Sequence, residues 1–334
     1  MGSRFGMERK LIPKSYRILL TSQIPFLGKG ICAMPCFFTL LFVSFIESVL
    51  ILLRERPNSV VGTGGYGSFS LVFIATIVGI PTFITEVDTV PGLATKILSR
   101  FVQEIYLGSP ISKKWLPKSR NVFVTGIPVR SSILEKDRDK AYKKFGLKPN
   151  PTVLVIGGSR GASSINRAFC EALEYFPSHL QFILQTGEKD FKNMSIMLLK
   201  RGYPNRVKVF KFIEDMGCAY ACADLVVSRA GALAIAEIEA TNKPSILVPY
   251  PYAARNHQLL NAKVLEKSGA AKLILDNELN GKVLAKEVLR IIEDDELRKR
   301  MREAAKNLSS LNASSFIVER ISRYGRVKMM KSVS

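Results

Sequence analysis

The sequence predicts an α/β protein built from two doubly wound parallel sheets. Short apolar runs alternate with helix-length segments along most of the chain, which is the pattern of successive βαβ units. The chain has 334 residues, more than one ordinary core needs, so two domains are expected. A Gly/Pro turn at residues 126–130, followed by a highly charged segment, separates the two series of elements.

Each expected strand is a short apolar run bounded by turn or charged residues. These runs lie at residues 59–61, 82–84, 121–125, 152–156, 181–185, 208–212, 225–228, 245–248 and 272–275. Helices are expected at 31–53, 134–144, from about 163, at 231–240, and as consecutive amphipathic helices within 279–325. The predicted domains are residues 1–128 and 129–310, with a C-terminal helix in 311–334 that packs back on the first domain.

Residues 31–53 are apolar, and Glu47 is their only charged residue. The length of this segment would cross a bilayer. A carboxylate near its centre would be costly in lipid, Pro35 interrupts its start, and a strand follows at once. We therefore expect a buried or membrane-facing helix of a globular domain, with a transmembrane span or an interfacial helix as alternatives. Residues 1–17 show no cleavable signal peptide.

The net charge of +21 is spread over both halves of the chain. Such a field attracts nucleic acid, anionic membranes and phosphorylated substrates alike. No nucleic-acid-binding motif is present, so a membrane surface or a diphosphate lipid is favoured over nucleic acid. Five cysteines without a CxxC motif indicate reduced, buried thiols, and with only two histidines no metal site is expected.

Residues 62–67 read Gly-Thr-Gly-Gly-Tyr-Gly and formally match the dinucleotide-binding fingerprint. Glu86 and Asp88 follow at about the distance at which that fingerprint places its acidic residue. A long helix precedes this strand, however, whereas the fingerprint commonly opens a fold. A loop for another diphosphate ligand is favoured over a nicotinamide or flavin site and over a plain tight turn.

A second glycine-rich loop, residues 157–162, joins an expected strand to a helix. Its glycines permit close backbone approach, Ser159 offers a hydroxyl, and the helix start carries a partial positive charge. The loop lacks the Lys-Ser/Thr pair of a P-loop, which argues against nucleoside triphosphate hydrolysis. A phosphate-binding loop is favoured over a tight turn without a ligand.

Residues 228–261 contain Arg229 in a small-residue turn, Glu237 inside the following helix, and Gln258 and Asn261 after the next strand. A carboxylate at this place can accept hydrogen bonds from the hydroxyls of a ribose, and amides can form hydrogen bonds with sugar hydroxyls. Glu237 could instead be only a favourable charge near a helix start. All four residues follow strand ends, where ligands of open α/β sheets bind, so a nucleotide-sugar site is predicted.

The motif order resembles that of the MurG family, membrane-associated N-acetylglucosaminyltransferases that convert lipid I into lipid II. The resemblance extends from residue 2 to about residue 323, and together its motifs are highly specific. They read GTGGY, GIPVR, GGSRGA, QTG, FIEDM, SRAGA and HQLLNA.

The resemblance implies a GT-B fold, in which two Rossmann-like domains face a cleft and the second domain holds UDP-GlcNAc. By position, Ile213 would meet uracil through its backbone and Glu237 the ribose. Ser159 and the Ala232–Leu233 turn would hold the diphosphate, with Gln258 and Asn261 on the sugar. The full implied donor set is Arg130, Ser159, Arg160, Ile213, Arg229, Ala232, Leu233, Glu237, Gln258 and Asn261. The implied acceptor and diphosphate set is Gly64, Gly65, Tyr66, Glu86 and Asp88.

The family inverts configuration without an obligatory cofactor, and a divalent cation at most stimulates the reaction. Hydrogen-bond donors at helix ends and in loops would stabilise the departing UDP while the muramyl C4 hydroxyl attacks. The implied partners are UDP-GlcNAc, lipid I, the anionic inner membrane surface and cell-wall synthesis proteins. The implied location is the cytoplasmic face of the cell membrane, as a peripheral protein.

This sequence departs from the family pattern at its start and at several positions. The family's first strand and Gly-Gly-Thr-Gly-Gly-His loop would precede residue 1, so the first domain is expected to lack its first βαβ element and transfer is expected to be impaired. Thr85 and Asp88 stand where the family has His and Asn, Arg160 stands for Gln, and Ile127 for Asn. Asp88 is therefore the candidate catalytic base, with a helix N-cap as the alternative.

Other functions stay open from the sequence. One is a non-catalytic nucleotide-sugar-binding partner at the membrane. A second is a related lipid glycosyltransferase with a diacylglycerol-type acceptor, and a third is a dinucleotide-dependent oxidoreductase that uses residues 62–67.

Overall fold

The computed structural model describes residues 2–4, 12, 16–23, 34–118, 121–134, 136–203 and 205–331. Its internal contacts divide the chain into two compact units. The first unit contains residues 1–126 and 312–334, and the second contains residues 127–311. The sequence-based boundaries were expected after residues 128 and 310.

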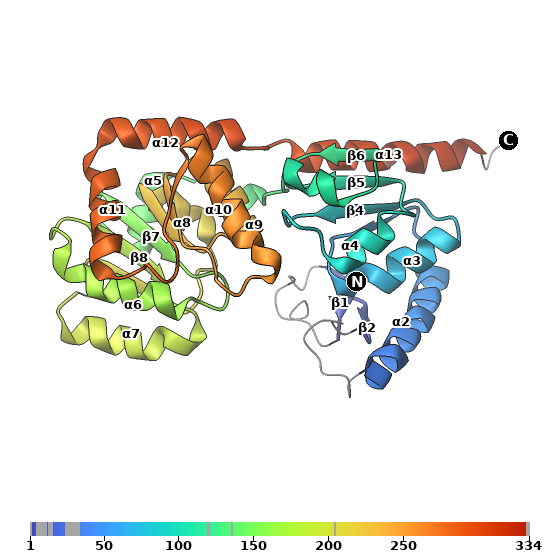
Figure 1. Ribbon diagram of the computed structural model, residues 1–334, viewed down its shortest axis with the longest axis horizontal. Helices are drawn as coiled ribbons and strands as arrows, with labels where there is room; N and C mark the ends of the chain where they lie inside the picture. Colours follow the sequence, from blue (N-terminus) through green and yellow to red (C-terminus); the bar gives the residue numbers. More distant parts are fainter. Residues whose placement is uncertain are drawn as a thin grey trace. The chain divides into compact units, whose positions relative to one another are not determined.

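The second unit is a six-stranded parallel sheet (Figure 1). Its spatial order is β12-β11-β10-β7-β8-β9, so the direction of strand addition reverses between β7 and β10. The carboxyl ends at such a reversal are where open α/β sheets bind ligands. The strands are β7 (Thr152–Ile156), β8 (Gln181–Gln185), β9 (Val207–Phe210), β10 (Leu225–Ser228), β11 (Ser245–Leu247) and β12 (Ala271–Leu273).

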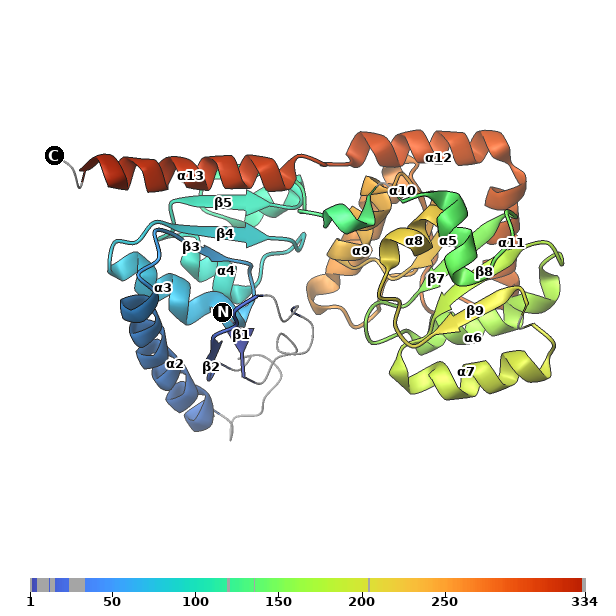
Figure 2. The same cartoon turned by 180° about the vertical axis from the view of Figure 1, so that it is seen from behind.

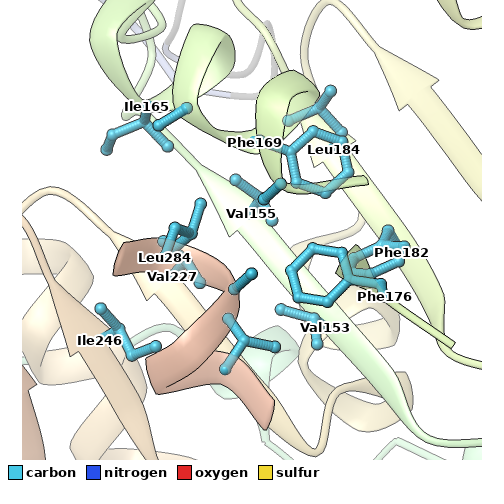
Figure 3. Close-up of a cluster of buried hydrophobic side chains, with 14 of the residues drawn as sticks. Val153, Val155, Ile165, Phe169, Phe176, Phe182, Leu184, Val227, Ile246 and Leu284 are labelled. Carbon is cyan, nitrogen blue, oxygen red and sulfur yellow. The ribbon is translucent and has the colours of Figure 1, made fainter. Parts of the chain in front are cut away.

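Helices cover both faces of this sheet, because alternate strand residues point to opposite sides. Val153 and Val155 pack toward one cluster of buried side chains (Figure 3), whereas Leu154 and Ile156 pack toward another. The first cluster includes residues of α6 (Ser163–Ala172), α7 (Glu188–Lys200) and α11 (Gly281–Glu293). The second includes residues of α5 (Arg138–Phe145), α8 (Met216–Cys222), α9 (Ala232–Ala240), α10 (His257–Ser268) and α12 (Asp295–Leu308).

The first unit has a four-stranded parallel sheet in the order β3-β4-β5-β6 and a separate two-stranded parallel pair. The four strands are β3 (Val60–Gly62), β4 (Thr82–Glu86), β5 (Glu104–Leu107) and β6 (Asn121–Val124). The pair consists of β1 (Gly2–Ser3) and β2 (Leu20–Thr21). Strands β1, β2 and β5 were not expected from the sequence.

Two layers of helix enclose the four-stranded sheet, as Figures 1 and 2 show. On one face α2 (Met34–Glu55), α3 (Phe69–Ile77) and α4 (Leu93–Leu98) contribute to the core. On the other face α13 (Ala313–Lys331) packs against Phe83 and Tyr106 through Ile317 and Tyr324. The last helix of the chain therefore belongs to the core of the first unit.

A buried carboxylate at the start of β5 fixes α13 to the sheet. Glu104 is 1% exposed and accepts hydrogen bonds from Arg320, at 2.8 and 2.5 Å, and from the hydroxyls of Tyr106 and Tyr324. Burial alone would raise the pKa of Glu104, but these hydrogen bonds lower it below its ordinary value of 4.5. The charge is thus fully paired where an unpaired one would be very costly.

The helix expected at 134–144 begins later than predicted. The Asp137 side chain accepts the backbone N–H groups of Asp139 and Lys140, which caps α5 at Arg138. The thiol prediction holds for Cys170, Cys218 and Cys222, which are free and buried, but it is wrong for the exposed Cys36. Cys32 and the first three residues of the apolar segment lie outside the described residues.

Helix α2 turns a polar stripe inward and an apolar stripe outward. Its buried residues are Ser44, Ser48 and Leu52, and the two serine hydroxyls bind Ser70 of α3 at 2.7 and 2.9 Å. Glu47 accepts hydrogen bonds from the backbone and side chain of Ser22. The exposed large apolar residues on the helix are Met34, Phe38, Phe42, Ile46, Val49, Leu50 and Leu53. By length and composition alone α2 could cross a membrane, although serine contacts tie it to the first unit.

Replacing Arg320 by alanine should destabilise the first unit, because Glu104 would stay buried without its cation. We expect a loss of about 3 kcal/mol in the free energy of unfolding. Trp115, the single tryptophan of the chain, lies in this unit, so its fluorescence reports urea unfolding there. As a control, Arg323→Ala breaks an exposed pair with Glu319 and should cost less than about 0.5 kcal/mol.

The cost of Arg320→Ala should also depend on pH. Because the pKa of Glu104 is lowered in the folded protein, its contribution is complete above the ordinary value of 4.5. This stabilisation is lost as the pH falls through the lowered pKa of Glu104. The difference in the free energy of unfolding between Arg320→Ala and the unchanged protein should therefore shrink in that pH range. A difference that stays constant into that acid range would contradict the assignment.

Candidate functional site

The loop after β7 lies in direct backbone contact with the turn after β8. A Cβ atom on Gly161 would lie 2.0 Å from the carbonyl oxygen of Thr186, and one on Gly187 would lie 2.4 Å from that of Arg160. Both glycines also have positive φ angles, +77° and +78°. The two turns can approach this closely only because neither carries a side chain at these positions.

Ser159 and Arg160 lie at the exposed tip of this loop. Neither side chain has a hydrogen-bond partner in the part of the chain that the structure describes. The loop leads into α6, whose start has no side-chain cap. Loop and helix start together offer a hydroxyl, a guanidinium and backbone N–H groups to an anion.

Gln185, which the sequence analysis did not single out, joins two parts of the site. Its side chain is 4% exposed, donates to the carbonyl of Gly158 at 3.0 Å and accepts the N–H of Ile213 at 2.8 Å. The backbone group that Ile213 can offer a ligand is therefore its carbonyl. A glutamine directly after three apolar strand residues, Phe182 to Leu184, was the signal available in the sequence.

A cavity of about 570 Å³ adjoins Ile213. Its walls combine apolar side chains with charged groups of both signs, which suits a flat ring that carries polar edges. The apolar part includes Phe210, Phe212 and Ile213, and the charged part consists of Arg130, Lys136, Lys144, Glu214 and Asp215.

Arg229, at the end of β10, lies 11% exposed among groups from several other elements. Its guanidinium donates to the carbonyls of Val248 and Pro249 after β11, each at 3.2 Å. It also pairs with Asp276 at 2.5 Å and donates to Ser164 of α6 at 2.8 Å. The structure thus places Arg229 as a tie between loops, whereas the sequence analysis placed it among ligand contacts.

Helix α9 begins at Ala232 with Gly231 as its N-cap and no side-chain cap, so its first N–H groups have no side-chain partner. Leu233 is 60% exposed at this start. The turn from Arg229 to Ala232 therefore presents a second helix start at the carboxyl ends of the strands, beside the reversal between β7 and β10.

Glu237 lies on α9 and is held by two side chains. It accepts a hydrogen bond from the Tyr220 hydroxyl at 3.2 Å and lies 3.7 Å from Arg130. Burial raises its pKa above the ordinary value of 4.5, although Tyr220 and Arg130 act in the opposite direction. The carboxylate keeps acceptor capacity for ligand hydroxyls.

The two amides expected to contact a sugar differ in their surroundings. Gln258 is half-buried, and its carbonyl oxygen accepts the N–H of Tyr250 at 3.0 Å, which points the amide along the loop after β11. Asn261 is 7% exposed and donates to the carbonyl of Ala230 at 3.0 Å. Asn261 thus supports the turn before α9.

In the first unit, Gly64 and Gly65 have positive φ angles and lead into a short 3-10 helix, Tyr66–Ser68. Glu86 is 3% exposed and accepts the N–H groups of Asp88 and Gly92 at 3.1 and 3.4 Å. A Cβ atom on Gly64 would lie 3.4 Å from a Glu86 carboxylate oxygen. Glu86 therefore holds the turn after β4 against the glycine loop, and burial raises its pKa.

Asp88 is half-buried after β4. The N-cap of α4 is Gly92, so Asp88 does not cap that helix, the alternative role that its position before Pro91 suggested. Its carboxylate has no hydrogen-bond partner among residues that the structure describes. It can accept a proton from a ligand.

Two family models match the chain. The glycosyltransferase family 28 N-terminal domain matches residues 3–107, and the glycosyltransferase family 28 C-terminal domain matches residues 152–317. Together they cover every candidate donor and acceptor residue except Arg130, which lies between the two matched segments.

Curated relatives are similar over nearly the whole chain. A protein of Thermodesulfovibrio yellowstonii is 40% identical over 96% of this chain and 88% of its own length. One of Syntrophus aciditrophicus is 37% identical over the same shares. Both are named UDP-N-acetylglucosamine–N-acetylmuramyl-(pentapeptide) pyrophosphoryl-undecaprenol N-acetylglucosamine transferase.

Among solved structures, Acinetobacter baumannii MurG superposes with a TM-score of 0.72 at 27% identity, over 96% of this chain and 89% of that one. Staphylococcus aureus MnaA in a structure with UDP shares the fold, with a TM-score of 0.65 at 14% identity over 90% and 84% of the two chains. The predicted fold class, α/β of GT-B type with two Rossmann-like domains, is confirmed.

Replacing Gly161 by alanine should destabilise the second unit more than the same change at Gly202. Both glycines have positive φ angles, but a Cβ atom at Gly202 meets nothing within 4 Å. We expect Gly202→Ala to cost about 1 kcal/mol and Gly161→Ala to cost clearly more, because the loops after β7 and β8 must separate. Urea unfolding followed by circular dichroism measures both, and equal costs would contradict the close contact.

Proposed function

The chain belongs to glycosyltransferase family 28 and, within it, to the MurG family, and from this membership we infer that it transfers N-acetylglucosamine from UDP-GlcNAc to lipid I. The product is lipid II, a precursor in peptidoglycan synthesis. The observation that carries this function is similarity to curated transferases over 96% of the chain, together with a constellation of loop, helix start and carboxylate at one sheet edge.

For the donor, we propose that the second unit binds UDP-GlcNAc at the carboxyl ends of its strands. The cavity beside Ile213 would take uracil, with the Ile213 carbonyl facing the base. The Glu237 carboxylate would accept hydrogen bonds from the ribose hydroxyls. Ser159, Arg160 and the start of α9 at Ala232 would bind the diphosphate.

The sugar would lie near Gln258, whereas Arg229 and Asn261 would act indirectly by holding the loops. Arg130, 3.7 Å from Glu237, would set the orientation and charge of that carboxylate. Leu233 would cover the diphosphate from the helix start, since it is exposed there.

The reaction that we propose is a direct inverting displacement. The C4 hydroxyl of the muramyl sugar attacks the anomeric carbon of GlcNAc, the bond to the UDP oxygen breaks, and the hydroxyl proton passes to a base. Charge develops on the diphosphate, where helix-start and loop N–H groups stabilise it without requiring a cofactor. Asp88 is the proposed base, because its carboxylate is half-buried and follows the end of β4.

For the acceptor, we propose that the loop of Gly64, Gly65 and Tyr66 contacts the diphosphate of lipid I. Tyr66 is 37% exposed at the start of the short 3-10 helix. Glu86 would position this loop from behind, because it lies against Gly64 and holds the turn that contains Asp88.

Transfer can be tested directly with radiolabelled UDP-GlcNAc and lipid I in detergent. We expect the label to appear in lipid II and not in free sugar. Impaired turnover, expected from the sequence, stays a prediction that the initial rate in this assay measures. Binding of UDP-GlcNAc without any labelled lipid product would contradict the transferase function and leave a nucleotide-sugar-binding protein.

Replacing Glu237 by glutamine should weaken UDP-GlcNAc binding, since one charged acceptor for the ribose is lost. We expect the Kd from calorimetry to rise by about tenfold or more. Burial raises the pKa of Glu237, so on acidification this carboxyl becomes protonated at a pH above the ordinary glutamate value of 4.5. The affinity of the unchanged protein for UDP-GlcNAc should fall in that pH range. Glu239→Gln, on the same helix, is the control, and equal effects of the two changes would remove Glu237 from the site.

We further propose that the protein associates peripherally with the cytoplasmic face of the membrane through α2. This helix carries seven large exposed apolar side chains, a feature typical of lipid contact. The net charge of +21 favours an anionic surface. Cell-wall synthesis proteins at the same membrane are proposed partners.

A double change of Phe42 and Leu50 to glutamate should reduce binding to vesicles that contain phosphatidylglycerol. Both side chains are more than half exposed, at 65% and 61%, so folding should be preserved. Ile196→Glu with Leu199→Glu, on α7 of the second unit, adds the same charge at exposed apolar positions and serves as the control. Equal loss of sedimentation with vesicles in both variants would indicate a charge effect and contradict contact through α2.

A further inference from the structure

A second polar cavity of the second unit lies on the amino-end side of the sheet strands, whereas the proposed donor site lies at their carboxyl ends. Its volume is about 420 Å³, and Thr241, Asn242 and Lys243 form part of its wall. These residues follow α9 and precede β11, so they lie at the amino end of that strand. The proposed donor site uses the carboxyl ends. Among the described lining residues only Lys136 borders both cavities, so the two sites are separate apart from this shared lysine.

The lining of this cavity is dominated by cations. Among the lining residues that the structure describes, Glu303 is the single acidic one. The five cations are Lys136, Arg138, Lys243, Arg302 and Lys306. Such an excess of one sign in a concave site raises the local concentration of ions of the opposite sign.

One carboxylate behind the wall compensates only part of this charge. Asp224 pairs with Arg138 at 2.7 Å and lies 3.6 Å from Arg302. Lys243 donates to the carbonyl of Ala223 at 2.8 Å, a neutral acceptor. Asp224 and Glu303 together carry two negative charges against five positive ones.

Lys243 shows the effect of this crowding. Burial, and after it the nearby guanidinium of Arg302, lower the pKa of Lys243 to about 8. A bound anion would relieve the repulsion among these cations.

We propose that this cavity binds a phosphate-bearing small molecule, with the phosphate between Lys243, Arg302 and Lys306. Guanidinium and ammonium groups are the side chains that bind phosphate most strongly in proteins. The occupant is a soluble phosphate compound, since the site is a cavity between α12 and the end of α9 whose described lining holds no large apolar side chain of the kind that lipid would contact.

A smaller chamber beside the cavity indicates what the phosphate is attached to. It has a volume of about 250 Å³ and shares Lys243 and Asn242 with the cationic cavity. Its other walls include Ile133, Leu134 and Tyr220, which suit an apolar or aromatic group. The ligand class is therefore a phosphate ester with a compact apolar part.

Calorimetric titration with sodium tripolyphosphate tests the cationic cavity. In R302Q/K306Q the affinity should fall by about tenfold, because two charge-assisted contacts are lost. Both residues lie on the outer part of α12, and Asp224 keeps its partner Arg138, so the fold should persist. Phosphate binding at the donor loop is unchanged in the variant and cancels in the comparison.

The matched control is K263Q/K267Q on α10, which removes the same two charges at the same spacing from exposed positions. We expect its affinity for tripolyphosphate to equal that of the unchanged protein. Equal losses in the two double variants, or no measurable binding to the unchanged protein, would overturn the site.

A second arm replaces tripolyphosphate by vesicles with and without phosphatidylglycerol. The proposal expects R302Q/K306Q to bind these vesicles as the unchanged protein does. Weakened vesicle binding in R302Q/K306Q with unchanged tripolyphosphate binding would assign the cations to lipid headgroups and overturn a soluble ligand.

Discussion

The proposed donor-binding unit of this protein depends on the position of one largely buried guanidinium. Arg229 leaves the end of β10 and binds carbonyls after β11, the carboxylate of Asp276 after β12, and the hydroxyl of Ser164 at the start of α6. These contacts hold four segments at the carboxyl edge of one sheet. The contacts of Arg229 therefore position the turn that starts α9, and through that helix they position Glu237. A buried cation with so many acceptors is costly to disturb, which keeps the edge rigid before a ligand arrives.

Close backbone packing complements this tie on the other side of the reversal point. Glycines let the loops after β7 and β8 touch, and the buried amide of Gln185 connects the first of them to Ile213. The residues proposed to contact base, ribose and diphosphate thus lie on linked loops, which would preorganise the proposed site for a nucleotide sugar. In the first unit, Glu86 has the corresponding supporting role behind the glycine loop.

Local patterns predicted most of the sheets, because strands such as Thr152–Ile156 and Gln181–Gln185 are apolar runs with clear turns on both sides. Strand β5 escaped prediction because it begins with Glu104, whose charge is paired by Arg320, 216 positions away. The same limit applies to the site. Motifs located Ser159 and Glu237, but the inward roles of Arg229, Asn261 and Gln185 depend on partners that only the folded chain brings together.

The most direct measurement is a crystal structure of the protein with UDP-GlcNAc bound. The account predicts ribose hydroxyls on Glu237, the diphosphate between the Ser159 loop and the start of α9, and Arg229 still paired with Asp276. A complex in which Arg229 leaves Asp276 to bind the diphosphate, or in which the nucleotide lies away from Glu237, would contradict it.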